Sequence, residues 1–212
     1  MDWKRYAVYW LPDRELGRAG AAWLGWDART GVPVPRGDPA AEGPRRYGFH
    51  ATLKAPFRLR GTEKDLLNEC AALAMCLSRL PPQMLSVEDI GGFLALKPGD
   101  EGPSRILAAR LVEGLDRFRA PPDPAELTRR RASGLSPAQD DLLVRWGYPY
   151  VMAEHRLHLT LTGALPPDGT ASRIRTHFAA ALAIPAPITA IALMGEDAEG
   201  RFHLIREMPL QG

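Results

Sequence analysis

Two histidines occupy the same four-residue pattern in this chain. His50 begins HATL and His158 begins HLTL, so the motif HxTL occurs twice, 158 minus 50, or 108, residues apart. On a strand, residues i and i+2 share one face, so each histidine is expected to project beside its own threonine, Thr52 or Thr160. Each copy of the motif therefore offers an imidazole next to a hydroxyl group.

This duplicated set of side chains suits phosphodiester chemistry. Attack at phosphorus requires one group to take a proton from the nucleophile and another to give a proton to the leaving oxygen. Two imidazoles with a pKa near about 6.5 can do both near neutral pH. The threonine hydroxyls can hydrogen-bond the non-bridging oxygens as charge develops on them. A single histidine on a strand is more often structural, but its repetition in the same context favours catalysis.

Three further side chains are candidates for substrate binding. Lys54 follows Thr52 by two residues and Arg156 precedes His158 by two, so strand alternation predicts each on the face of its histidine, where it can neutralise a phosphate. Ordinary exposed surface charge is an equal alternative for both cations. Tyr47 is expected to line the same cleft.

Two other patterns could indicate a metal site or a phosphate site. His155 and His158 are three residues apart, which places them on one face of a helix but on opposite faces of a strand, and no cluster of cysteine or carboxylate residues accompanies them. We therefore expect no metal and no cofactor. The arginine run 129–131 is interpreted as a solvated charge run, with a phosphate contact as its alternative.

The elements that position the motifs recur in the same order. A strand carrying HxTL, a helix and a two-stranded hairpin are predicted in residues 47–97 and again in 150–208, an internal repeat typical of two related halves. Further predicted elements are a strand at 6–11 and helices at 16–24, 104–118 and 137–146. The sequence thus predicts one α+β domain, 1–212, in two pseudo-twofold lobes. Their approximate ranges are 47–100 and 148–212, with a helical connector at 101–147 and strand 6–11 packing on the sheets.

The composition limits the classes of partner that the protein is expected to bind. The 212 residues carry 27 basic and 25 acidic side chains, a formal charge of +2, so no global field attracts a long nucleic acid or an anionic membrane. Two cysteines without CxxC spacing, and no apolar leader or 18-residue apolar stretch, indicate a cytoplasmic protein without a membrane partner.

The residues around the two motifs add a specific resemblance. YGFHATLKAPF and HRLHLTLTG resemble the paired signature motifs of the 2H phosphoesterase superfamily. Together with GYPYV, they are similar to the branch often encoded beside phosphonate-degradation genes. The resemblance implies two antiparallel sheets lining a central cleft with helices outside, and no metal. It also implies His50 and His158 as the catalytic acid and base, with Thr52 and Thr160 binding the phosphate.

The expected activity is that of a phosphoric diester hydrolase, a cyclic phosphodiesterase acting on a small ribose or nucleotide cyclic phosphate. An RNA 2′,3′-cyclic end is the nearest alternative substrate. A non-catalytic RNA- or nucleotide-binding module is an alternative of another class. The pseudo-symmetry leaves open which histidine is the base, and the oligomeric state is equally open.

Overall fold

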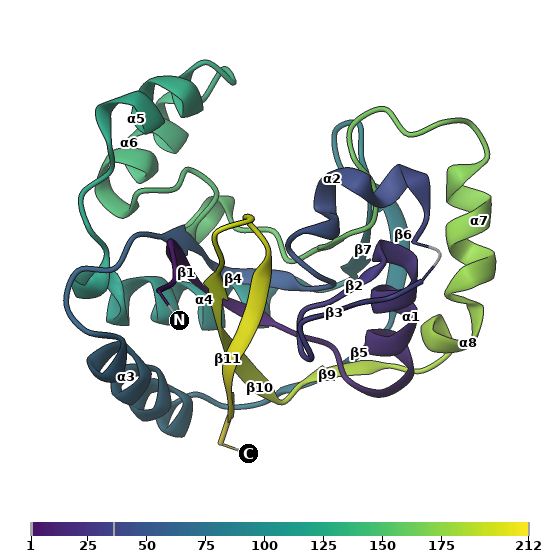
Figure 1. Ribbon diagram of the computed structural model, residues 1–212, viewed down its shortest axis with the longest axis horizontal. Helices are drawn as coiled ribbons and strands as arrows, with labels where there is room; N and C mark the ends of the chain where they lie inside the picture. Colours follow the sequence, from purple (N-terminus) through teal and green to yellow (C-terminus); the bar gives the residue numbers. More distant parts are fainter. Residues whose placement is uncertain (1, 36, 212) are drawn as a thin grey trace.

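A seven-stranded sheet forms the centre of the protein in the computed structural model, which describes residues 2–35 and 37–211 (Figure 1). Its strand order is β11-β10-β1-β4-β8-β7-β6, and neighbouring strands pair antiparallel. The strands are β1 (Arg5–Trp10), β4 (Ala51–Phe57), β6 (Leu85–Asp89), β7 (Leu94–Pro98), β8 (Leu159–Thr160), β10 (Ala190–Glu196) and β11 (Phe202–Pro209). The predicted α+β class is confirmed.

Helices gather in two groups beside this sheet. Figure 1 shows α3 to α6 on one side of the view and α1, α2, α7 and α8 on the other. The helices are α1 (Arg14–Leu24), α2 (Glu42–Arg45), α3 (Glu63–Cys76), α4 (Gly102–Gly114), α5 (Pro124–Arg131), α6 (Pro137–Trp146), α7 (Thr170–His177) and α8 (Ala179–Leu182). Two small sheets, β2 (Trp26–Asp27) with β3 (Val32–Pro33) and β5 (Leu80–Gln83) with β9 (Ala186–Ile188), complete the fold.

The sheet order corrects the expected arrangement of the two halves. The strands do not form two separate sheets, because β4 and β8, which follow the two motif histidines, pair directly and join all seven strands. The hairpins are also exchanged. The β6–β7 hairpin follows the first motif but lies beside β8, whereas β10 and β11 follow the second motif and lie beside β1. Likewise, β1 lies within the sheet, between β10 and β4, rather than on its surface.

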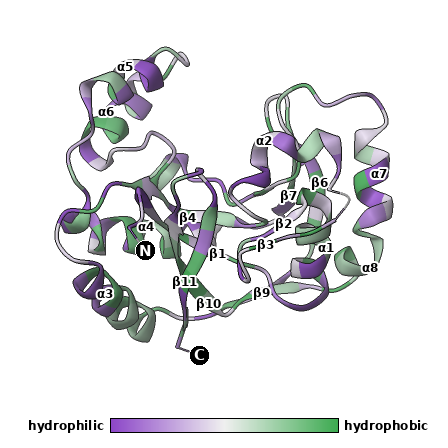
Figure 2. Cartoon of the chain, viewed as in Figure 1, coloured by the Kyte–Doolittle hydropathy of each residue, from purple (hydrophilic) through white to green (hydrophobic). Residues whose placement is uncertain are grey.

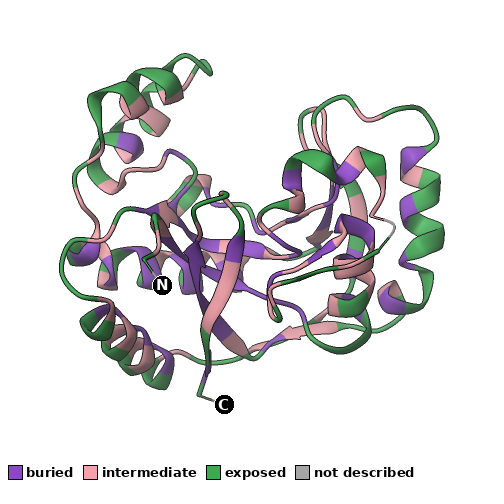
Figure 3. Cartoon of the chain, viewed as in Figure 1, coloured by how far each residue is buried: buried purple, intermediate pink, exposed green. Residues whose placement is uncertain are grey.

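Apolar side chains cover both faces of the central strands. On one face they form the larger core with α1, α3 and α4, and this core includes Val8, Leu53, Leu111 and Leu159. On the other face, a smaller cluster surrounds Tyr9, together with residues of β2, β10 and β11. Figure 2 shows the apolar colouring along these strands, and Figure 3 shows them buried while α5 is largely exposed.

Local signals located several helices correctly. The Thr62 side chain accepts a hydrogen bond from the Asp65 backbone and caps α3, just before an acidic first turn. Ser136 and Gln139 form a capping box at α6, with Pro137 in the first turn. These short-range devices depend only on neighbouring residues and are therefore readable from sequence.

Other boundaries differ from the predictions. Residues 47–50 form a turn before β4 rather than part of the strand, and the second motif contributes only the two-residue β8 after a 3₁₀ turn at Met152–Glu154. Helix α4 ends at Gly114, and α7 is separated from α8 at Phe178. Helix α5 lies in the connector between the helices predicted at 104–118 and 137–146, where the Asp123 side chain caps its start and Pro124 fits its first turn. Within the described residues, no helix is long and apolar enough to cross a membrane.

Gly20 allows α1 to approach the segment that carries the first motif. A Cβ atom at this position would overlap the Phe49 ring, which packs in the core one residue before His50. We expect Gly20→Ala to lower the free energy of unfolding by about 1–3 kcal/mol, because overpacking outweighs the gain in helix propensity. Urea unfolding followed by circular dichroism measures this loss. Gly43→Ala in α2, where a Cβ atom has ordinary van der Waals space, is the control, and an equal effect of both changes would contradict the interpretation.

Candidate active site

His50 is held immediately before β4 by a turn that requires glycine. Gly48 has φ 72°, and a Cβ atom there would overlap the Ala28 side chain. The His50 Nδ1 atom lies 2.9 Å from the Gly48 carbonyl oxygen, and its ring stacks on Tyr9 with centroids 3.8 Å apart. Its Nε2 atom lies 3.2 Å from Thr52 Oγ1. The imidazole is therefore fixed by backbone, aromatic and hydroxyl contacts together.

His158 has the same local geometry before β8. Its Nδ1 atom lies 2.8 Å from the carbonyl oxygen of Arg156, again two residues earlier in the chain. The Phe93 ring lies beside it, with centroids 5.7 Å apart. The repetition of the motif in sequence is thus matched by a repetition in hydrogen bonding.

Strand pairing brings the two motifs together. Ala51 of β4 pairs with Leu159 of β8, and both are fully buried on the core face. Continuing this antiparallel register by one residue in each direction places His50 opposite Thr160 and Thr52 opposite His158. All four side chains then share the other face of the sheet, at neighbouring positions.

The backbone contacts fix the proton positions of both rings. A carbonyl oxygen can only accept, so each Nδ1 atom carries hydrogen and donates it. Each neutral ring therefore keeps its lone pair on Nε2, the atom that can accept a proton from a nucleophile or, once protonated, donate one. In His50 this Nε2 atom accepts a hydrogen bond from the Thr52 hydroxyl.

Burial favours the uncharged form of both imidazoles. It lowers the pKa of His50 to about 4, and the hydrogen bond to Gly48 and the nearby His158 have smaller effects. Burial also lowers the pKa of His158 below its usual value. An anionic phosphate between the two rings would favour imidazolium and move these pKa values upward again. The site is therefore poised for one ring to gain a proton when an anion binds.

Lys54 does not lie beside the motif, and its predicted placement is wrong. Thr52 pairs with Tyr9, but Lys54 pairs with Val8, so β4 contains a bulge at Leu53. The extra residue turns Lys54 onto the core face that Val8 occupies. There its ammonium group donates to the Val112 carbonyl oxygen at 3.2 Å, near the C-terminus of α4, and burial lowers its pKa to about 8.

The other two predicted binding residues lie near the motifs. Tyr47 stacks on Phe202 with centroids 5.3 Å apart, lies 6.1 Å from the His50 ring and accepts a hydrogen bond from Arg46. Arg156 is exposed, and its backbone carbonyl holds His158. Their roles toward a substrate stay predictions.

Tyr9 and His155 contribute to the site although sequence patterns did not single them out for it. Tyr9 forms the surface on which His50 stacks, which could be anticipated only from the pairing of β1 with β4. His155 is buried, and its Nε2 atom lies 3.1 Å from the Thr52 carbonyl oxygen. His155 therefore links the segment before the second motif to the backbone of the first, instead of pairing with His158 as a metal ligand.

The structure also describes the surroundings of the other two sequence patterns. Among residues 2–35 and 37–211, no group of three or more His, Cys, Asp or Glu side chains is arranged to hold a metal ion. In the arginine run, Arg130 pairs with Glu126 and lies over the Tyr148 ring, while Arg131 pairs with Asp140. These two arginines brace α5 and α6 through internal contacts.

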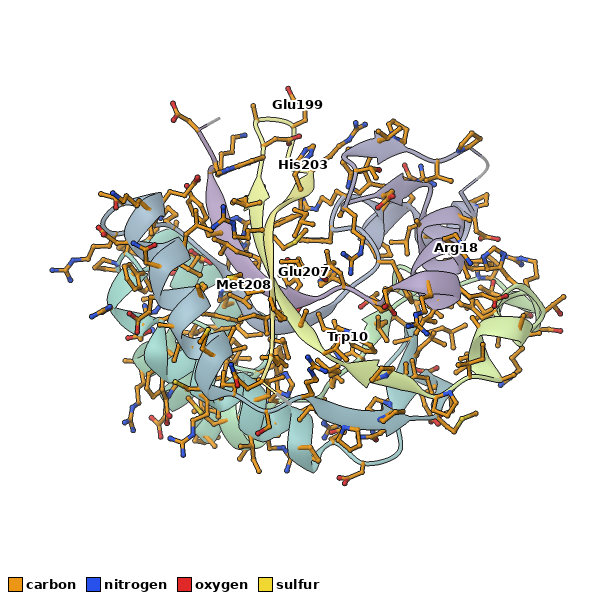
Figure 4. The ribbon with its side chains drawn as sticks, turned by 90° about the horizontal axis from the view of Figure 1, so that it is seen from below. Trp10, Arg18, Glu199, His203, Glu207 and Met208 are labelled. Atoms are coloured by element: carbon orange, nitrogen blue, oxygen red, sulfur yellow. The ribbon has the colours of Figure 1, made fainter. Side chains whose placement is uncertain are left out.

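A cavity of about 530 Å³ lies between α1 and the β2–β3 hairpin, and the four motif residues do not line it. Phe49 and Arg29 are among its lining residues. Arg29 donates two hydrogen bonds to Glu207, at 2.7 and 2.8 Å, and thereby ties the hairpin to β11. Figure 4 labels Glu207 on β11, and His203 lies on the same strand nearer to Glu199, at the turn between β10 and β11. The cavity is thus a feature distinct from the histidine pair.

A comparison with known protein families shows to which family the chain belongs. The model of a family described as "Protein of unknown function (DUF1045)" matches residues 52–203, which is most of the chain and includes the whole second motif. The chain belongs to this family. Its match begins at Thr52, two residues after His50.

Two curated relatives of this DUF1045 protein carry the name "Ribose 1,5-bisphosphate phosphokinase PhnN". The protein from Janthinobacterium sp. (strain Marseille) is 39% identical over 92% of this chain and 48% of its own length. The protein from Laribacter hongkongensis (strain HLHK9) is 37% identical over 95% of this chain and 51% of its own length. The chain therefore spans about half the length of these relatives.

Two solved structures resemble the fold at low sequence identity. A structure described as "Crystal structure of phosphoesterase" aligns over 100% of both chains with a TM-score of 0.47 and 13% identity. The structure of Kluyveromyces marxianus Usb1 aligns over 99% of both chains with a TM-score of 0.41 and 12% identity.

The low pKa of His50 predicts a specific pH dependence of stability. Because burial lowers this pKa, the unfolded chain binds a proton first as the pH falls from about 6.5 towards 4, and the free energy of unfolding decreases over that range. Between pH 7 and pH 4.5, we expect the free energy of unfolding to decrease by about 1–3 kcal/mol less in His50→Asn than in the wild type. Urea unfolding of both proteins at the two pH values measures it. Parallel pH dependences would contradict the buried, neutral state of His50.

Proposed function

We propose that this DUF1045 protein is a metal-independent phosphodiesterase of the 2H type that opens a small cyclic phosphate ester. The observation that carries the proposal is the pair of HxT motifs on adjacent strands of one sheet, each histidine held through Nδ1 by the carbonyl two residues earlier. Both rings then carry their lone pair on Nε2, the atom for proton transfer, on the face that also carries Thr52 and Thr160.

The reaction needs only these groups and water. One imidazole Nε2 takes a proton from the water while the water oxygen bonds to phosphorus. The other ring, as imidazolium, gives its Nε2 proton to the ester oxygen as the P–O bond of the cyclic phosphate breaks. The product is a phosphate monoester with a free hydroxyl. Thr52 and Thr160 can donate hydrogen bonds to the non-bridging oxygens, on which negative charge builds in the transition state.

A ribose cyclic phosphate is the first substrate to test. The name of the two relatives refers to a ribose bisphosphate, and this chain corresponds to about half of each of them. A low net charge, +2 in 212 residues, also favours a small ester over a long RNA. A nucleoside 2′,3′-cyclic phosphate and an RNA with a 2′,3′-cyclic end complete the panel.

The test is hydrolysis of this panel with and without EDTA, followed by phosphorus NMR to identify the bond that opens. We expect turnover to persist in EDTA, and His50→Asn and His158→Asn each to lower kcat about 10²–10⁴-fold, the range for a general acid or base. His177→Asn, at an exposed histidine of α7 bonded to the Ala19 carbonyl, is the control. Unchanged turnover in either motif variant, or loss of turnover in EDTA, would contradict the mechanism. Binding without turnover would instead indicate a non-catalytic nucleotide-binding module.

A further inference from the structure

A lysine that the sequence patterns did not single out lies across from His158. In β7, Ala95 pairs with Thr160 and Leu96 with Leu159, so continuing the register by one residue places Lys97 opposite His158. Lys97 then shares the sheet face of the motifs, with His158 between it and Thr52. The charges agree with this placement: after the larger effect of burial, Glu101 raises the pKa of His158 and Lys97 lowers it.

Glu101 holds the Lys97 side chain in position. The Lys97 Nζ atom lies 2.7 Å from Glu101 Oε1, and the Lys97 side chain is 33% exposed whereas that of Glu101 is 12% exposed. The other oxygen of Glu101 lies 3.7 Å from the Arg105 guanidinium. The carboxylate is therefore anchored between two cations, and the Lys97 side chain stays partly exposed.

The same contacts connect Lys97 to the first motif. Arg105 Nε donates to the His155 carbonyl oxygen at 3.4 Å, and the His155 ring bonds the Thr52 carbonyl oxygen. Lys97, Glu101 and the segment before His158 are thus fixed to the backbone of β4. Such anchoring keeps a charged group in place without reorganisation when a ligand arrives.

Three other cations near the motifs have partners of their own. Lys54 is buried on the core face, bonded to the Val112 carbonyl oxygen. Arg46 donates to the Tyr47 hydroxyl and lies over its ring, and Arg105 is paired with Glu101. Of these cations, Lys97 is the one that the strand register places opposite His158.

We propose that Lys97 binds the phosphoryl group of the substrate beside His158, and that Glu101 positions its ammonium group for this contact. This inference rests on the proposed phosphodiesterase function and adds a cation to the two imidazoles and two hydroxyls. Attack on a phosphodiester adds negative charge to the non-bridging oxygens, and a fixed ammonium group stabilises that charge. In the structure, Glu101 balances the charge of the lysine.

The test compares Lys97→Met and Lys97→Arg with the wild-type protein and with Lys64→Met, which changes an exposed lysine on α3. We expect Lys97→Met to lower kcat/KM for the cyclic phosphate about 10²-fold, as removal of one charge-stabilising donor does elsewhere. Lys97→Arg keeps the charge and is expected to recover part of the loss. Lys64→Met is expected to match the wild type.

A binding measurement separates this inference from the proposed function. Inorganic phosphate is titrated into each protein while the His158 ring proton signals are followed by NMR. We expect the dissociation constant for phosphate to rise at least about tenfold in Lys97→Met, as expected for loss of a charge-assisted contact. If the wild type binds phosphate through Lys97 but hydrolyses no cyclic ester, the proposed function fails and the assignment of Lys97 as a phosphate ligand stands.

The inference is overturned if Lys97→Met has the same phosphate affinity and the same kcat/KM as the wild type. Circular dichroism checks folding. Should the methionine variant be unfolded, Lys97→Gln replaces it, with the same expected and overturning results.

Discussion

The pairing of Ala51 with Leu159 is the contact on which the site depends. It joins two segments that are distant in sequence, and it is the point where β4 and β8 unite all seven strands in one sheet. Because the side chains of Ala51 and Leu159 are fully buried, the polar residues that flank each of them in the motifs must face the other side of the sheet. A slip by one residue would turn the histidines into the core, so burial of a small apolar pair fixes the orientation of the chemistry.

Backbone carbonyls then determine what the histidines can do. Each ring is locked through Nδ1 to a carbonyl two residues earlier, which makes both Nε2 atoms available on one face. The surroundings differ beyond this common geometry. His50 stacks on Tyr9 and contacts its own threonine, whereas the Phe93 ring lies beside His158 and the register of β7 places Lys97 opposite it. The repeated motif therefore places its two imidazoles in unequal surroundings.

The strand order explains this inequality. The first motif lies beside β1, which brings an aromatic neighbour, while the second lies beside β7, which brings a cation. β1 and the first motif come from the same half of the chain, whereas β7 comes from the first half and lies beside the motif of the second. The neighbours of the second motif are therefore supplied by a distant part of the sequence.

The sequence by itself determined the α+β class, the capped helices α3 and α6, and the identity of the two HxT pairs, because caps, alternation and a repeated motif are local properties of the chain. Tertiary structure alone decided which lysine approaches the motifs. A bulge at Leu53 turns Lys54 into the core, and pairing with β7 brings Lys97 to His158. Bulges and cross-strand partners depend on contacts between distant segments, so strand alternation within one motif cannot reveal them.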